Sequence, residues 1–153
     1  MTVTFSVYQA QKDAQHTLQL NIVKYCFLLC DSLRDNYIAY AIDSHENSIY
    51  LADAGDSYSV NYHTTCIEKL KDGLCDYDFA LDSSGRKYHK IWMWIDGKRS
   101  SIHAFIDKKS GEVYKPASIK APAKGVRYNL LLIKDREWLL ENADWAGSYL
   151  YNR

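Results

Sequence analysis

The chain has 153 residues, of which 47% are hydrophobic, and its 19 basic residues balance 19 acidic ones. With only 2 Pro, 7 Gly and 25% charged residues, the composition excludes collagen-like, disordered and coiled-coil proteins. The most apolar run, 21–30, is about half as long as a membrane span and contains Lys24, and the first residues lack the pattern of a signal peptide. We therefore expect one soluble domain over 1–153, in the cytoplasm and with no membrane partner.

The first half of the chain predicts helices separated by an irregular region. Residues 14–34 predict an amphipathic helix because apolar side chains recur at spacings of three and four. Its apolar stripe comprises Leu18, Ile22, Tyr25, Cys26, Leu29 and Leu33. Residues 36–60 mix short β-type runs with Asp, Asn, Ser and Gly, which predicts strands or irregular structure. A short helix is expected over 64–72, where Thr64 or Thr65 can cap the start and Gly73 ends it.

From residue 86 the apolar period changes to two, which is typical of strands. Residues 87–95 and 98–107 predict a β-hairpin because they flank Asp96-Gly97, a dipeptide that tolerates the positive φ angles of a tight turn. A second turn at 107–112 leads into a third strand, 112–115, and Pro116 ends it. The sequence therefore predicts a three-stranded antiparallel meander.

The remaining chain is expected to close the fold. The Pro- and Ala-rich stretch 116–125 predicts an ordered loop, 126–133 a further strand, and 135–143 a helix whose Trp138 and Leu139 face inward. The predicted fold class is α+β, with an antiparallel meander sheet packed against an N-terminal and a C-terminal helix.

The hairpin register predicts two different sheet faces. A two-residue loop at Asp96-Gly97 pairs Ile95 with Lys98, so alternate residues of the meander share a face. One face is aliphatic, and the other is aromatic and cationic, comprising Tyr88, Lys90, Trp92, Arg99, His103, Phe105 and Tyr114. Two interpretations of the aromatic face stay open: a solvent-facing platform that stacks bases, or part of a core.

Charge is segregated along the chain although the total is zero. The acidic half, 1–85, has 5 basic and 12 acidic residues, for a net charge of −7. The basic segment, 86–127, has 11 basic and 3 acidic residues, for a net charge of +8, and the closing segment, 128–153, is near neutral. Basic residues interleaved with aromatic ones are typical of surfaces that bind phosphates and stack on bases.

We therefore expect a non-enzymatic protein that binds nucleic acid, most plausibly single-stranded, or a nucleotide-like anion, and that needs no cofactor. The residues expected to contact phosphates are Lys90, Arg99, Lys108, Lys109, Lys115, Lys120, Lys124 and Arg127. The residues expected to stack on bases are Tyr88, Trp92, Phe105 and Tyr114, with His103 beside them. A competing hypothesis is a protein-interaction module, in which the acidic and basic halves mediate homo-oligomerisation or bind a host protein.

No catalytic or metal-binding motif accompanies this charge pattern. The chain lacks phosphate-binding loops, dinucleotide fingerprints, hydrolase elbows and zincin motifs. Its four cysteines lack a CxxC spacing, which favours reduced core thiols over a zinc site or a disulfide. His63-Thr64-Thr65 matches half of a two-histidine phosphoesterase pattern, but the nearest second half, His103-Ala104-Phe105, lacks the hydroxyl.

The run IHAFIDKKSGEVYKPASIKAPAKGVRYNL at 102–130 resembles a segment that recurs in small uncharacterised bacteriophage proteins, of the form HAF-[VI]-D-K-x-[ST]-G-[DE]-[VL]-[YL]-K-P-A-S. The resemblance extends over 87–129, about a third of the chain, and Ile119 stands where the pattern favours an aromatic residue. It implies a phage or prophage origin and action in the host cytoplasm, and it supplies no catalytic residues that could be assigned to this chain. It also suggests an anti-defence protein that sequesters a nucleotide signal.

Overall fold

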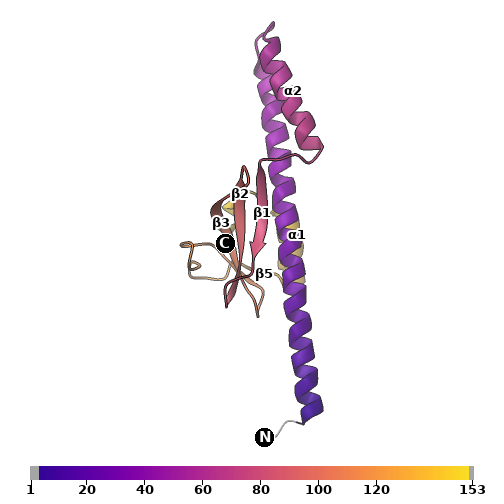
Figure 1. The fold of residues 1–153 in the computed structure, drawn as a ribbon, viewed down its shortest axis with the longest axis vertical. Coiled ribbons are helices and arrows are strands. Elements are labelled where there is room, and N and C mark those ends of the chain that lie inside the picture. The colour runs from indigo at the N-terminus through magenta and orange to yellow at the C-terminus, as the bar shows by residue number, and fades with distance from the viewer. Residues whose placement is uncertain (1–3, 152–153) are drawn as a thin grey trace.

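The computed structural model describes residues 4–151, in which a helical spine carries a five-stranded antiparallel sheet, with strand order β1-β2-β3-β4-β5 (Figure 1). The elements in chain order are α1 (Phe5–Leu51), α2 (Ser57–Lys71), β1 (Tyr77–Asp82), β2 (Tyr88–Ile95), β3 (Lys98–Asp107), β4 (Glu112–Tyr114), β5 (Tyr128–Asn129), α3 (Ile133–Asn142) and the 3-10 helix η1 (Ser148–Leu150). The predicted α+β class is therefore confirmed. No helix within residues 4–151 combines the length and the apolar character needed to cross a membrane.

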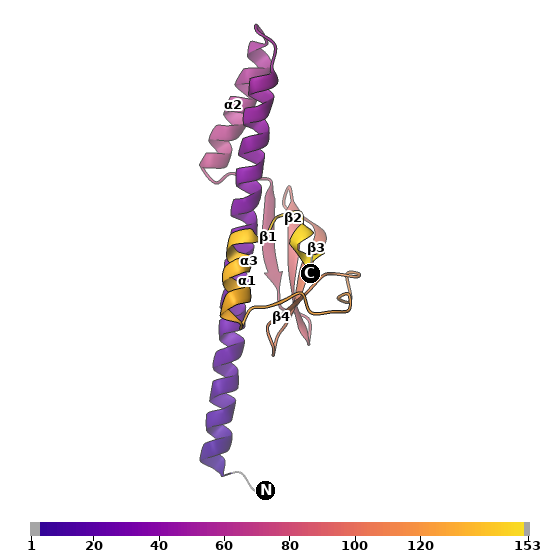
Figure 2. The same ribbon diagram turned by 180° about the vertical axis from the view of Figure 1, so that it is seen from behind.

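Helix α1 is the longest element, with 47 residues and a length of about 70 Å. It begins after Thr4, whose side chain accepts a hydrogen bond from the Val7 amide. The strands predicted within 36–60 are wrong, because the helix continues to Leu51 and buries Ala41 in a second interface beyond the sheet. Both ends of α1 extend past the sheet (Figures 1 and 2).

Helix α2 folds back antiparallel along the C-terminal part of α1 and buries Ile67 and Leu70 (Figure 1). It begins at Ser57, earlier than the predicted helix 64–72, because the Asp56 carboxylate accepts a hydrogen bond from the Ser59 amide at 3.1 Å and caps this earlier turn. The chain leaves α2 at Gly73 in a left-handed conformation, as predicted for the helix stop.

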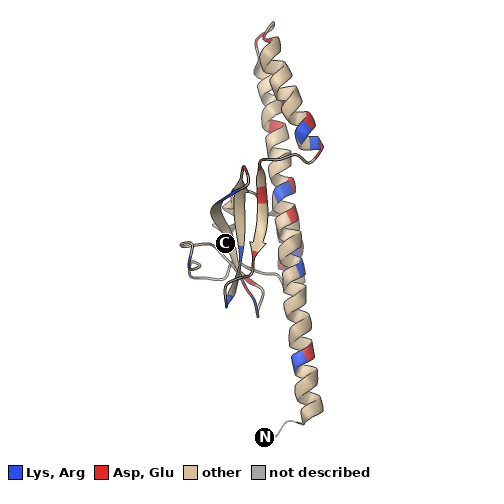
Figure 3. Ribbon diagram, viewed as in Figure 1, with Lys and Arg blue, Asp and Glu red and all other residues tan. Residues whose placement is uncertain are grey.

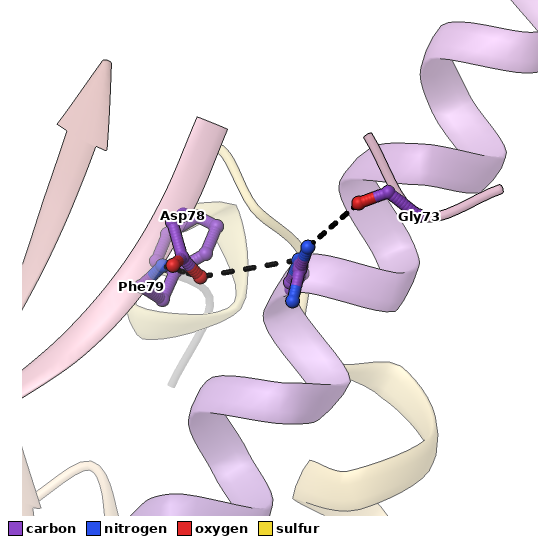
Figure 4. Close-up of polar contacts among 4 residues, drawn as sticks. Gly73, Asp78 and Phe79 are labelled. Carbon is purple, nitrogen blue, oxygen red and sulfur yellow. Dashed lines mark hydrogen bonds and ion pairs between the residues drawn. The ribbon is translucent and has the colours of Figure 1, made fainter. Parts of the chain in front are cut away.

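Arg34 of α1 holds the connection between α2 and the sheet (Figure 4). Its Nη2 donates a hydrogen bond to the Gly73 carbonyl at 2.8 Å, and its Nε lies 4.0 Å from Oδ1 of Asp78 in β1. Nearby, Tyr37 of α1 stacks on Tyr77 of β1 at 4.1 Å between ring centres, and Trp145 meets Tyr37 edge-on. These contacts fix the orientation of the helical hairpin, formed by α1 and α2, relative to the sheet.

One face of the sheet packs on the middle of α1. The buried side chains of the helix recur at spacings of three and four, and they are Ile22, Cys26, Leu29, Cys30 and Leu33. They contact a core that includes Phe79, Ile91 and Ile106 from the sheet and Leu139 from α3. The apolar stripe predicted for residues 14–34 is therefore correct from Ile22 onward. Leu18, which was predicted to belong to it, is 46% exposed.

The turn of the β-hairpin between β2 and β3 is as predicted, but the register changes along the two strands. Asp96 and Gly97 both have positive φ, at 52° and 74°, and Ile95 pairs with Lys98. Two irregularities then shift the pairing, so Lys90 pairs with Phe105, whereas an uninterrupted register from Ile95 and Lys98 would pair it with His103. Strand β3 accommodates one extra residue at each shift, which a sequence pattern of strict alternation does not reveal.

His103 lies at one of these shifts, so its predicted place on the aromatic face is wrong. Its side chain is 8% exposed, meets Phe79 edge-on, and its Nε2 lies 2.8 Å from the Tyr149 hydroxyl. Burial lowers the pKa of His103 to about 4, although Asp144 opposes this shift. Ile102 takes the opposite side and packs with Trp92 and Phe105.

The aromatic face of the sheet is a second apolar core. Phe105 has no exposed surface and Trp92 is 8% exposed, while half-buried Tyr88 and Tyr114 pack against Phe105 and one another. Cations cover the rings: the Arg99 guanidinium lies 4.7 Å from the Trp92 ring centre, and the Lys90 ammonium 5.6 Å from that of Phe105. The interpretation of this face as an open stacking platform is therefore wrong for Phe105 and Trp92.

The closing segment differs from its prediction mainly at its boundaries. Strand β5 has two residues, and Ile133 begins α3 instead of ending a strand. Leu139 is buried as predicted, whereas Trp138 is 42% exposed and stacks on Tyr128. The ordered loop at 116–125 is held by a bridge between Pro116 and Pro122.

The core assignment of Phe105 predicts a large loss of stability on truncation. Phe105→Ala should lower the free energy of unfolding by about 3–5 kcal/mol, because it leaves a cavity between Trp92 and Tyr114. Urea denaturation followed by circular dichroism measures this change. The control Ile119→Ala alters a side chain that is 63% exposed and should shift stability by about 0.5 kcal/mol or less. Equal stabilities of the two variants would refute the assignment.

The buried neutral His103 predicts acid sensitivity. Because its folded pKa is about 4, against an ordinary value of 6.5, the unfolded chain binds the extra proton between these pH values. His103 should therefore cost up to about 3 kcal/mol of stability as the pH falls from 7.5 to 4. His103→Gln should show a shallower decline in denaturation curves over this range, since His45 and His89 titrate in both proteins. Parallel declines would contradict the burial of a neutral imidazole.

Candidate anion-binding pocket

A pocket of about 650 Å³ lies between α1 and the two connections at one end of the sheet. The connections are the β1–β2 loop at 83–87 and the β3–β4 turn at 108–111. Figure 3 shows basic residues at this lower end of the sheet, beside the lower half of α1. The lining residues are His16, Gln19, Leu20, Val23, Arg86, Lys87, His89, Asp107, Lys108 and Lys109.

Helix α1 supplies one wall of the pocket. His16, Gln19, Leu20 and Val23 are spaced by three, one and three residues, so they lie on one helical face. This face begins six residues, or nearly two turns, before Ile22, the first residue of the buried stripe. Packing of that stripe on the sheet therefore sets the position of the wall. The wall is apolar at Leu20 and Val23 and polar at His16 and Gln19.

Lys108 joins the two connections that form the opposite wall. Its ammonium donates hydrogen bonds to the carbonyl oxygens of Ser83, at 2.6 Å, and Gly85, and its backbone amide donates to the Lys87 carbonyl. A charged donor shared by two carbonyls rigidifies both segments. Lys108 therefore shapes the pocket as well as adding positive charge.

Among the described residues that line the pocket, Asp107 is the single acidic one, and its carboxylate accepts hydrogen bonds from the turn. Its Oδ1 accepts hydrogen bonds from the backbone amides of Lys109 and Ser110, at 2.8 and 3.0 Å. Burial acts to raise the pKa of Asp107, but these hydrogen bonds and Lys87 outweigh it and hold the pKa below its ordinary value. The carboxylate thus orders the turn that carries Lys109.

His89 contributes a buried, neutral imidazole. Its Nδ1 lies 2.7 Å from the Ser83 hydroxyl, and the side chain is 4% exposed. Burial lowers the pKa of His89, and the positive charge of Lys108 lowers it further. His89 therefore adds hydrogen-bonding capacity to the pocket without a charge at neutral pH.

Three exposed cations complete the rim: Arg86, Lys87 and Lys109. Arg34 pairs with Asp78 at 4.0 Å and Arg99 pairs with Asp82 at 3.5 Å. Neither pair includes a cation of this rim, so the rim keeps its positive potential. Cations beside an apolar wall give the pocket the chemistry needed for an anion that also carries an apolar or planar group.

The structure gathers only some of the residues predicted to bind a ligand. Lys108 and Lys109 line the pocket. Lys90 and Arg99 cover the second core, where Lys90 donates to the Ile119 carbonyl at 2.8 Å and Arg99 lies 3.5 Å from Asp82. The aromatic residues predicted to stack lie in or around that core, away from the pocket: Tyr88, Trp92, Phe105 and Tyr114.

The remaining predicted cations follow β4 on the loop that leads to β5. Lys115 lies over the ring of Tyr151, and Lys120 and Lys124 are exposed. Arg127 donates its backbone amide to the Val113 carbonyl at 2.8 Å. This loop projects from the side of the sheet opposite α1 (Figures 1 and 2), so these residues do not join the pocket.

Sequence reasoning missed the helical wall of the pocket and the part played by Arg86, Lys87 and His89. The basic segment 86–127 contains all three, but neither its charge nor its alternation shows that they face α1. The spacing of His16, Gln19, Leu20 and Val23 is a usable signal, since a mixed polar and apolar face next to a buried stripe indicates a groove.

Two other sequence hypotheses concerned histidines and cysteines. His63 lies on α2 with its Nδ1 2.8 Å from that of His45, while His103 pairs with Tyr149 in the core, so the two halves of the phosphoesterase pattern are not brought together. All four cysteines are free thiols, and burial raises the pKa of Cys26 and Cys30. In the part of the chain that the structure describes, no three His, Cys, Asp or Glu residues are grouped to hold a metal ion.

Comparisons with known proteins identify a family but not an activity. Neither a curated protein nor a solved structure matches the chain. Residues 5–152 match a family described as a family of unknown function (DUF7717), so the match includes α1, the hairpin, the sheet and the closing helices. The chain belongs to this family, DUF7717.

Proposed function

We propose that the protein is a non-enzymatic binding protein whose pocket takes a small, phosphate-bearing molecule of the nucleotide class. The observation that carries the proposal is the combination of Arg86, Lys87 and Lys109 with the apolar wall of Leu20 and Val23 around one pocket. Its volume of about 650 Å³ lies within the range of sites for cofactor-sized ligands. Phosphates would contact the cations, and the base would lie against α1.

The buried aromatic face favours a small ligand over a polymer. Single-stranded nucleic acid binds by stacking successive bases on exposed rings along a basic groove. Phe105 and Trp92 are buried, and Arg99 and Lys90 are engaged with Asp82 and Ile119, which removes the surface that such a strand needs. Nucleic acid therefore remains the alternative ligand, through the exposed loop that carries Lys120 and Lys124.

A biological form of this proposal follows from the resemblance of 102–130 to bacteriophage proteins. In an infected cell, a protein that binds a nucleotide in a pocket can lower the concentration of a nucleotide signal by sequestering it. Such a role requires tight binding and no turnover, and it would be exerted in the host cytoplasm.

A second candidate function, a protein-interaction module, is favoured by a different part of the molecule. The tip of the α1–α2 hairpin exposes Tyr50, Leu51 and Tyr58 by 85%, 69% and 83%. Large exposed apolar side chains at a projecting tip are typical of protein contacts.

The pocket proposal predicts a charge-dependent, saturable affinity for nucleotides. Calorimetric titration with a panel of nucleotides and inorganic pyrophosphate should give one site per chain with modest salt dependence. Arg86→Glu with Lys109→Glu should weaken binding about 10- to 100-fold, because each change replaces a charged donor by a repulsive group. The matched control, Lys120→Glu with Lys124→Glu, makes the same charge change on the other loop and should leave the affinity unchanged.

The same titration with single-stranded oligonucleotides distinguishes the alternative ligand. Polymer binding through exposed lysines should weaken steeply between 50 and 200 mM salt, and it should be lost in the Lys120 and Lys124 variant. If oligonucleotides bind with this salt dependence and this loss in the variant, and nucleotides do not bind, the binding site is the exposed loop and not the pocket. If neither nucleotides nor oligonucleotides bind, both binding proposals are rejected.

A further inference from the structure

The α1–α2 hairpin combines exposed aromatic side chains with uniform negative charge. Tyr50 and Tyr58 flank the turn at 52–56, which carries Asp53 and Asp56. From residue 35 to residue 68 the chain has six acidic residues and no Lys or Arg. The tip therefore presents exposed aromatic rings surrounded by negative charge. A surface that is both apolar and basic would be complementary to it.

The fold prevents this tip from meeting the basic pocket of its own chain. The hairpin projects beyond the end of the sheet where β1 begins, and the pocket lies at the opposite end, where β1 leads into the 83–87 loop (Figure 1). Arg34 and the stacked pair Tyr37–Tyr77 hold the hairpin in this direction. Any contact between the two surfaces must therefore be made between different molecules.

We infer that the hairpin tip of one copy docks into the pocket of a second copy, head to tail. The inference rests on the protein-interaction function proposed above and names its partner. In this contact a tyrosine ring lies against Leu20 and Val23 of the partner, a wall of the right size and polarity for it. Asp53 and Asp56 then face the cationic rim, in which Arg86 and Lys109 are exposed.

This geometry makes the contact heterologous, because each copy presents one tip and one pocket. Heterologous contacts propagate into chains, or into a ring if the rotation closes. The tip and a phosphate-bearing ligand need the same cations, so the two compete for the pocket. Ligand binding would then dissociate the assembly, and assembly would weaken ligand binding by the same factor.

Complementary variants test the contact. Sedimentation velocity of the wild-type chain should show species larger than the monomer whose dissociation constant rises about tenfold or more from low to high salt. The tip variant, Tyr50→Lys with Tyr58→Lys, and the pocket variant, Arg86→Glu with Lys109→Glu, should each be monomeric. An equimolar mixture of the two should form a dimer and nothing longer, because one intact tip meets one intact pocket.

A control variant separates this contact from non-specific association. Tyr8→Lys with Phe27→Lys makes the same charge change on exposed positions of α1 outside the tip and the pocket, and it should assemble like the wild type. Circular dichroism checks that every variant is folded. A wild-type chain that stays monomeric at low salt, or a mixture of the two variants that stays monomeric, would overturn the inference.

Nucleotide titration of the tip variant keeps the two proposals distinguishable. The tip variant retains the pocket, so normal nucleotide binding by this variant with a monomeric wild type would reject the assembly alone. Head-to-tail assembly without any nucleotide binding would support the inference and reject the nucleotide proposal.

Discussion

The packing of one helical stripe against the sheet is the interaction on which the rest of the structure depends. Ile22, Cys26, Leu29 and Leu33 are fully buried, and they lie in the middle of a helix that extends in both directions. Because a helix is rigid over this length, the same contact sets the position of the hairpin at one end and of the helical wall at the other. The positions of the pocket and of the tip both follow from the packing of this one helical stripe.

The two faces of the sheet are covered by different means. Helices α1 and α3 cover one face, whereas the other is closed by its own aromatic side chains with Lys90 and Arg99 above them. A cation that packs its stem over a ring keeps its charge at the surface, so an apolar cluster can carry positive residues without burying a charge. This explains how a pattern typical of a stacking platform occurs in a core.

Local chemistry was predictable, and contacts between distant segments were not. Asp96-Gly97 and the alternation around it predicted the hairpin because a tight turn is determined by the two residues within it. The helix predicted over 14–34 was correct but continues on both sides, whereas the strands predicted within 36–60 were wrong. Ala41 and Ile49 suit either structure, and the packing of α2 against this part of the chain favours the helix. Lys108 and Lys109 were identified from charge, but their partners on α1 lie more than 80 residues away in the chain.

The central claim is that the ligand site lies between α1 and the two sheet connections, not on the aromatic face. Backbone amide chemical shifts, measured by NMR during titration with a nucleotide, test it most directly. The account predicts shifts at 16–23, 85–89 and 107–110, with the amides of Trp92, Phe105 and Tyr114 unchanged. Shifts concentrated on the aromatic face or on the 115–127 loop, with none along α1, would contradict it.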